Sequence, residues 1–236
     1  MAAFLSKGYG IPVEPANLFI TSGASSALDL LCTLYTEPGD VVFVEEPSYF
    51  LALRIFADHG LKVVSIRTDQ DGLVIDSLQE HLETCRPKFI YIIPAFQNPT
   101  GCTLPDERRQ QLLDLCSVHG FMIVADEVYH LLHYGTLPPS PMASRIESGK
   151  VVSISSFSKI LAPGLRLGWI QASLEIIKRL TTCGLLDSGG GMNPFTSAIV
   201  RETLESGGLA GNISQLKSVY SKRLAAMDEA LQLHLP

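Results

Sequence analysis

Short apolar segments alternate along this chain with longer segments in which apolar residues recur every three or four positions. The short segments have the length and composition of strands, and they lie at 18–21, 41–46, 62–68, 89–95, 121–127, 151–154 and 165–172. The periodic segments predict helices at 25–36, 48–60, 75–83, 104–120, 173–183, 194–206 and 212–232. A strand followed by a helix, repeated several times, is typical of an α/β domain.

Several of the strand segments are continuously apolar, whereas a strand with one wet face alternates apolar and polar residues. This pattern predicts an α/β fold with a mostly parallel central sheet and helices on both faces. Ligands of such open sheets bind beyond the carboxyl ends of the strands. The loops that follow the strands are therefore where we expect the chemistry.

Composition narrows the class of protein. The chain has 236 residues, 46% of them hydrophobic, which is enough for one sizeable domain or one domain with an attachment. A net charge of −6 with scattered Lys and Arg argues against a nucleic-acid partner. No apolar run has membrane-spanning length and the N-terminus lacks a signal sequence, so we expect a cytoplasmic protein without a membrane partner. Five cysteines without a CxxC pair indicate reduced thiols and no metal site.

Polar residues that could bind a ligand follow several of the predicted strands. TSGASSALDLL, after the first strand, opens a helix whose free amides suit an anion such as phosphate, although Ser25 as an ordinary N-cap is an alternative. FQNPTG predicts a turn that directs the Asn98 amide into the cleft. Asp126 ends an apolar strand, where a carboxylate is costly to bury without a cation. SSFSKILAPGLRLGW places Lys159 just after a strand, with Arg166 seven positions later.

In order along the chain, TSGASSALDLL, EEPSYF, PAFQNPTG, VADEVYH and SSFSKILAPGLRLGW resemble the motifs of the fold-type-I pyridoxal-phosphate (PLP) enzymes. The similarity is to class I/II aminotransferases, in particular their 2-aminoadipate and aromatic branch. It implies that residues 1–236 form a PLP-binding large domain, and we expect the N-terminal arm and C-terminal small domain of longer family members to be absent. It also implies a homodimer that uses α-amino acid and 2-oxo acid substrates.

The resemblance assigns the catalytic roles. Lys159 would hold PLP as a Schiff base and, once released by an amino acid, would carry a proton at the substrate α-carbon. Asp126 would pair with the pyridine nitrogen and keep the ring an electron sink. Asn98 and Tyr129 would hydrogen-bond the phenolic oxygen of the ring, while Tyr129 as a core aromatic is the alternative.

The same resemblance assigns the remaining cofactor contacts. Arg166 would bind the phosphate with a planar charged fork, together with hydroxyls that the chain supplies after the last parallel strand. Tyr49 would stack on the ring, although packing beneath its helix is equally consistent with the sequence. The full set of predicted cofactor contacts is Ala24, Ser25, Tyr49, Asn98, Asp126, Tyr129, Ser156, Ser158, Lys159 and Arg166.

Other functions remain open from the sequence. Ser156 and Lys159 fit the S-x-x-K pattern of serine–lysine enzymes, but no K-T-G or S-D-N follows. GASSA approaches a nucleophile elbow, with Asp126 and either His130 or His133 as partners of Ser25, in a serine hydrolase. Some bacterial transcription regulators carry a similar domain as a sensor, and a PLP-binding module without catalysis is a further hypothesis.

Overall fold

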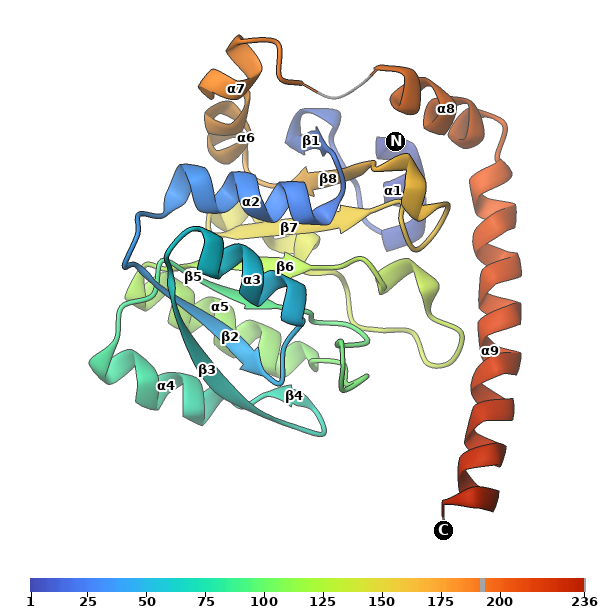
Figure 1. The fold of residues 1–236 in the computed structure, drawn as a ribbon, viewed down its shortest axis with the longest axis horizontal. Helices are drawn as coiled ribbons and strands as arrows, with labels where there is room; N and C mark the ends of the chain where they lie inside the picture. The colour runs from blue at the N-terminus through green and yellow to red at the C-terminus, as the bar shows by residue number, and fades with distance from the viewer. Residues whose placement is uncertain (192–193, 236) are drawn as a thin grey trace.

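Eight strands form a mixed sheet at the centre of the computed structural model, which describes residues 1–191 and 194–235 (Figure 1). Across the sheet the strands lie in the order β1 (Leu18–Thr21), β8 (Gly168–Gln171), β7 (Val151–Ser156), β6 (Met122–Asp126), β5 (Phe89–Ile92), β2 (Val41–Glu46), β3 (Lys62–Asp69) and β4 (Gly72–Leu73).

The sheet is mostly parallel, as the apolar strand segments predict. Strands β7, β6, β5, β2 and β3 pair in parallel, whereas β8 is antiparallel to both of its neighbours and β4 is antiparallel to β3. The carboxyl ends of β2, β5, β6 and β7 consequently lie along the same edge, which is where the polar loops emerge. The predicted α/β class is confirmed.

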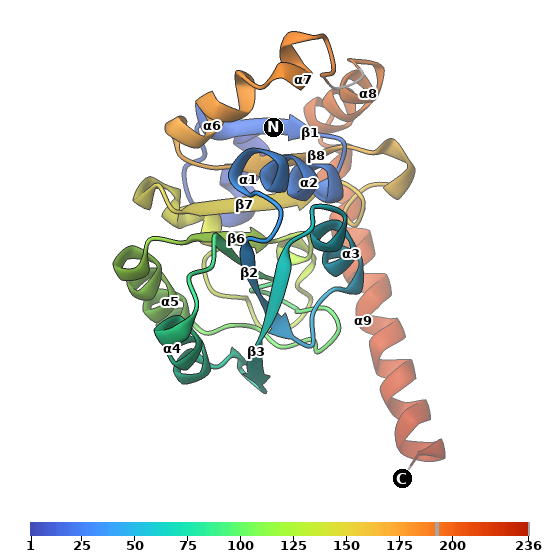
Figure 2. The same ribbon diagram turned by 60° about the vertical axis from the view of Figure 1, so that its left-hand side comes forward.

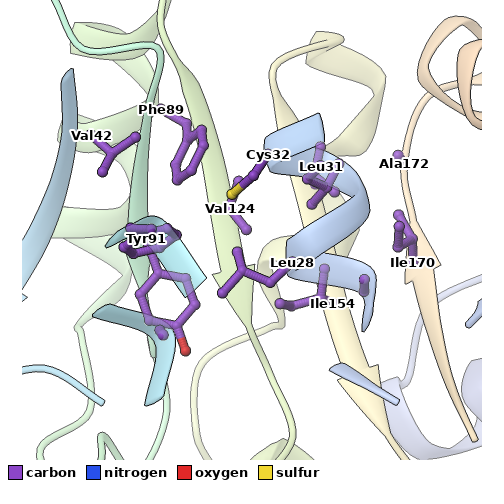
Figure 3. Close-up of a cluster of buried hydrophobic side chains, with 14 of the residues drawn as sticks. Leu28, Leu31, Cys32, Val42, Phe89, Tyr91, Val124, Ile154, Ile170 and Ala172 are labelled. Atoms are coloured by element: carbon purple, nitrogen blue, oxygen red, sulfur yellow. The ribbon is translucent and has the colours of Figure 1, made fainter. Parts of the chain in front are cut away.

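Helices cover both faces of the sheet. Helices α2 (Ala24–Tyr35), α3 (Phe50–Asp58) and α6 (Leu174–Thr181) pack on one face, and α4 (Ile75–Thr84) and α5 (Asp106–His119) pack on the other. Figure 3 shows Leu28, Leu31 and Cys32 of α2 lying over the sheet residues Val124 and Ile154. Because the strands meet apolar side chains on both sides, they need the continuous apolar sequence that distinguishes them.

A third apolar cluster surrounds the buried rings of Phe157 and Trp169, whose centroids lie 5.0 Å apart. Helix α1 (Ala2–Tyr9), α8 (Pro194–Glu205) and the first part of α9 (Gly208–His234) contribute to it. Farther along, α9 continues past the carboxyl edge of the sheet with exposed Leu224, Met227 and Leu231 (Figure 2).

The structure changes the boundaries of several predicted elements. The predicted 89–95 strand ends at Ile92, before Pro94, and the predicted 48–60 helix begins at Phe50 because Tyr49 has extended N-cap geometry. The predicted 165–172 strand begins only at Gly168, because Pro163–Leu165 form a 3-10 helix and Arg166 is left-handed. The 173–183 helix ends at Thr181 and a short helix, α7 (Gly184–Asp187), follows it.

Short elements escaped the periodicity analysis. Helix α1, strand β4 and the 3-10 turns η1 (Pro15–Asn17), η2 (His130–Leu132), η3 (Met142–Ser148) and η4 (Pro163–Leu165) were not predicted from the pattern. All of these elements are shorter than the window of about 11–18 residues over which a helical period can be established.

Candidate functional site

A cavity of about 220 Å³ opens at the carboxyl ends of the parallel strands. Its walls come from the start of α2, the start of α3 and the loops that follow β5, β6 and β7. Loops far apart in sequence meet there because parallel strands all end at one edge. The structure brings every predicted contact residue to this cavity: Ala24, Ser25, Tyr49, Asn98, Asp126, Tyr129, Ser156, Ser158, Lys159 and Arg166.

Asp126 ends β6 at the bottom of the cavity and is almost completely buried. The Tyr91 hydroxyl donates a 2.8 Å hydrogen bond to its Oδ2, and the Val128 amide donates at 3.4 Å to Oδ1. Burial raises the pKa of Asp126 to about 6, while the Tyr91 hydrogen bond acts in the opposite direction. In the described part of the chain no cation forms an ion pair with Asp126. A positively charged ligand group would offset the free-energy cost of burying this carboxylate.

Lys159 lies beyond the end of β7, in the turn that follows Ser156. Its Nζ is 6.0 Å from the centroid of the Tyr129 ring, and both residues line the cavity. Lys159 is exposed in this chain, so its amine is accessible to a molecule that enters from solvent. Burial and the Asp126 charge raise the pKa of the Tyr129 phenol, and the Asn98 amide acts in the opposite direction.

Hydroxyl, guanidinium and amide donors also line the cavity. Ser156 Oγ donates to Ser158 Oγ at 2.9 Å and also lies 3.1 Å from the Leu167 carbonyl oxygen. Arg166 donates to the carbonyl oxygen of Ser22 at 3.2 Å. Helix α2 begins at Ala24, so the first-turn amides have no partner within the helix. This arrangement can bind a phosphate-like anion.

The alternative that Ser25 caps α2 is wrong, because Gly23 occupies the N-cap and Ser25 lies inside the first turn. Gly23 has φ of 92°, a conformation that favours glycine. A Cβ on Gly23 would lie 2.9 Å from Arg166 Nη2. The bare backbone therefore lets the start of α2 approach the guanidinium.

Gly168 in β8 supports this close approach. A Cβ on Gly168 would lie 2.6 Å from the Ser155 carbonyl oxygen and 2.7 Å from Gly23 Cα, distances too short for real side chains. The backbone of Arg166 has φ of 48°, which costs about 1 kcal/mol in a residue other than glycine. Surrounding packing thus holds Arg166 in a strained conformation beside the α2 N-terminus.

Two kinds of residue at the site were missed from the sequence. Tyr91 bonds Asp126 and lines the cavity, and the only signal for it was a lone hydroxyl within the apolar segment FIYII. Gly23 and Gly168 shape the anion-binding end, but their contact joins residues far apart in sequence, and no local pattern indicates it.

Tyr49 satisfies both interpretations that the sequence left open. Its side chain packs partly against the core beneath α3, and it also lines the cavity. Its ring meets the Phe50 ring edge-on, with centroids 5.7 Å apart.

The hydrolase alternatives find less support in the geometry. Ser25 shares the cavity with Asp126, but His130 and His133 do not line it, and His130 instead packs its ring against Tyr9. Ser156 bonds Ser158 and the Leu167 carbonyl, and no hydrogen bond among the described residues joins it to the Lys159 amine. Within the described residues, neither Ser25 nor Ser156 is therefore hydrogen-bonded to a basic side chain that could activate it.

Among residues 1–191 and 194–235, no group of three or more His, Cys, Asp or Glu side chains could hold a metal ion. No helix there has both the length and the apolar character needed to cross a membrane.

The sequence profile described as aminotransferase class I and II matches residues 1–189. This chain belongs to the class I and II aminotransferase family. The family is PLP-dependent, and the match extends through all five loops that line the cavity.

Individual relatives agree with the family assignment. Aromatic-amino-acid aminotransferase 1 of Thermococcus litoralis is 36% identical over 242 residues, covering 100% of this chain and 58% of that protein. The crystal structure of LysN, an α-aminoadipate aminotransferase of Thermus thermophilus complexed with N-(5′-phosphopyridoxyl)-L-leucine, has a TM-score of 0.89 and 30% identity. That match covers 100% of this chain and 60% of LysN.

A relative of another kind also matches. The uncharacterized HTH-type transcriptional regulator YdcR of Escherichia coli is 32% identical over 230 residues, covering 96% of this chain and 48% of the regulator. The present chain thus spans between 48% and 60% of the length of these three relatives.

Proposed function

We propose that residues 1–236 form the PLP-binding large domain of an aminotransferase, which moves an amino group from an α-amino acid to a 2-oxo acid. The observation that carries the proposal is the charge arrangement of one cavity. One cavity contains a buried carboxylate, an accessible amine and a group of anion-binding donors. PLP carries complementary groups: a basic ring nitrogen, an aldehyde and a phosphate.

The residues present fit the cofactor on their own chemistry. Asp126 is buried without an ion-pair partner in the described residues, and a protonated ring nitrogen would supply the missing positive charge. Ser156, Ser158, Arg166 and the first amides of α2 would hold the phosphate. The close approach of Gly168 to Gly23 lets the start of α2 lie beside the Arg166 guanidinium.

Each residue has a definite task in the proposed reaction. PLP supplies an aldehyde that combines with amines and a ring that accepts electron density from the substrate α-carbon. The Lys159 amine would hold the aldehyde carbon in the resting enzyme, the aldehyde oxygen leaving as water, and would carry a proton at the substrate α-carbon during transfer. Asp126 holds a proton at the ring nitrogen, while Asn98 and Tyr129 orient the ring through its oxygen.

The test is a visible absorption spectrum of the purified protein mixed with PLP. We expect a visible absorption band at a longer wavelength than that of free cofactor, and we expect the Lys159→Ala variant to lose this band. Lys150→Ala is the matched control, because Lys150 directly precedes β7 at the end remote from the cavity. A wild-type protein without such a band, or a band that survives in Lys159→Ala, contradicts the proposal.

A second candidate is the sensor domain of a PLP-dependent regulator, favoured by the similarity to YdcR. The two functions differ in what an added α-amino acid does. An aminotransferase converts the bound cofactor to its amine form and releases a 2-oxo acid, which chromatography detects. A sensor keeps the visible band and releases no 2-oxo acid.

A further inference from the structure

Two polar side chains lie buried directly behind the cavity without lining it. Glu45, at the end of β2, is 1% exposed, and Gln97, in the loop after β5, is 2% exposed. Gln97 Nε2 donates to Glu45 Oε2 at 3.4 Å, so the two form one buried unit. Polar groups are buried at a cost unless their hydrogen bonds organise the surrounding chain. Neither side chain has a part in the proposed chemistry.

Gln97 connects two turns that are remote in sequence. Its Nε2 donates to the Pro47 carbonyl oxygen at 2.7 Å. Its Oε1 accepts two hydrogen bonds from Thr100, at 2.8 Å from the amide and 2.7 Å from the hydroxyl. The first turn leads to Tyr49 and the second contains Asn98, and both of these residues line the cavity.

The backbone of Gln97 fixes the second turn as well. Its amide donates to the Cys102 carbonyl oxygen at 2.9 Å, and its carbonyl accepts from the Gly101 amide at 2.6 Å. The preceding residue, Phe96, has φ of 54°, a strained conformation that persists only where neighbouring contacts hold it. The backbone and Oε1 of Gln97 therefore hold the turn that presents Asn98, while its Nε2 ties that turn to Pro47 and Glu45.

Glu45 anchors this unit to the sheet. Its Oε2 accepts a 2.9 Å hydrogen bond from the Ile93 amide, at the end of β5, in addition to the Gln97 contact. Tyr91 and Cys102 also lie close enough for the Glu45 charge to raise their pKa. Burial raises the pKa of Glu45 to about 8, so the carboxyl is mostly neutral at pH 7. Its contribution at that pH is a hydrogen-bonding position, which a neutral glutamine can also occupy.

We propose that Gln97, held in place by Glu45, is a positioning residue that sets Asn98 and Tyr49 against the cofactor ring at the same time. This inference rests on the proposed function, because it assigns Asn98 and Tyr49 to the ring. It goes further by identifying buried residues outside the cavity that determine how the ring is held.

The experiment compares Gln97→Ala with Asn98→Ala, which deletes the amide itself, and with Asn17→Ala. Asn17 is a matched control: it is 7% exposed and donates 2.8 Å from Nδ2 to the Ala172 carbonyl oxygen, and it does not line the cavity. For each variant the PLP dissociation constant, the pH midpoint of the visible band and the urea midpoint of unfolding are measured. The pH midpoint reports hydrogen bonding to the cofactor, which a loss of stability alone does not change.

We expect Gln97→Ala to weaken PLP binding about tenfold and to move the pH midpoint in the same direction as Asn98→Ala. Glu45→Gln should leave both readouts close to wild type, whereas Glu45→Ala should resemble Gln97→Ala. Asn17→Ala should lower only the urea midpoint.

The inference is overturned if Gln97→Ala binds PLP with an unchanged pH midpoint, as Asn17→Ala does. If Gln97→Ala does not fold, Thr100→Val replaces it, because it removes one donor to Gln97 Oε1 and keeps the side-chain volume. A midpoint shift in Thr100→Val supports the inference and an unchanged midpoint contradicts it. A wild-type protein without a band overturns the proposed function and this inference together, whereas a normal wild type with unaffected variants overturns only the inference.

Discussion

The bottom and the rim of the cavity are built in opposite ways. At the bottom, Asp126 and Tyr91 are buried and bonded to each other, and burial raises the pKa of both. At the rim, Ser25, Lys159 and Arg166 are exposed. At the bottom, the fold keeps a carboxylate buried despite the cost of desolvation. At the rim, close glycine contacts and the left-handed backbone of Arg166 fix the positions of the side chains.

This difference separates binding from stability. Removing the buried charge of Asp126 should stabilise the folded protein, but it also removes the group that pairs with the ring nitrogen in the proposed reaction. Removing a charged side chain at the rim leaves folding nearly unchanged and weakens ligand binding, because that side chain is already solvated. Substitution of Gly23 or Gly168, which are buried beside Arg166, should combine both effects, since it moves the backbone. The following changes test the contrast.

Asp126→Asn should have the largest effect, slowing amino-group transfer about 10³-fold through loss of the charge at the ring nitrogen. The cofactor-free protein should become more stable near pH 8, by about 3 kcal/mol, because the buried charge is gone. Single-turnover kinetics and urea unfolding measure the two quantities. Asp58→Asn, an exposed change on α3, is the control and should alter neither.

The stability of the wild-type protein should also depend on pH through the titration of Asp126. The pKa of Asp126 rises from its ordinary 3.8 to about 6 in the folded state, so the folded protein binds the proton more tightly than the unfolded chain. Its contribution to stability is therefore present below pH 3.8 and is lost as the pH rises to about 6. Asp126→Asn should abolish this part of the pH profile. An unchanged profile contradicts the assigned burial.

Gly168→Ala should be the next largest change. The new methyl group would meet the Ser155 carbonyl and the Gly23 backbone, which predicts a loss of about 3 kcal/mol of stability and of most PLP binding. Thermal unfolding and a spectroscopic titration measure these. Gly164→Ala is the control, because a Cβ there meets nothing within 4 Å. Equal stability of the two variants would show that the close approach does not exist in solution.

Arg166→Ala should weaken PLP binding about 30-fold, as expected for loss of a charge-assisted contact to phosphate. Because Arg166 is exposed, stability should change by less than about 0.5 kcal/mol. Arg166→Lys should recover part of the affinity, since it restores charge without the planar fork. Unaltered affinity in Arg166→Ala places the phosphate elsewhere.

Tyr91→Phe should have the smallest effect. It removes the donor to Asp126 Oδ2, so the pKa of Asp126 should rise further and PLP binding should weaken about fivefold. Carboxyl NMR titration of the cofactor-free protein measures the pKa directly. A lower pKa in the variant contradicts the assigned direction of this hydrogen bond.

The strand and helix segments were predictable because each depends on a local period. The apolar runs identified β2, β6 and β7 to within a few residues, and the helix at 212–232 corresponds to α9. Candidate residues such as Asp126 and Lys159 could be found for the same reason: each follows the end of an apolar strand. Their grouping required only that parallel strands end at one edge.

Contacts between remote segments were not predictable. Tyr91 bonds Asp126 across 35 positions, and Gln97 bonds Pro47 across 50. Such pairs depend on strand order, in which β5 lies between β6 and β2, and hydrophobic periodicity does not encode that order. The start of β8 was misplaced because the Pro163–Leu165 helix and the left-handed Arg166 interrupt the apolar segment, and neither follows from its periodicity.

The amino-acid sequence alone specified the class of fold, the strand ends and the reactive side chains placed there, because those properties are local. Folding in three dimensions set which carboxyl groups became buried, how far their pKa rose and how closely the α2 N-terminus approaches Arg166. These quantities arise from desolvation and steric contact between distant segments, which exist only once the chain has packed.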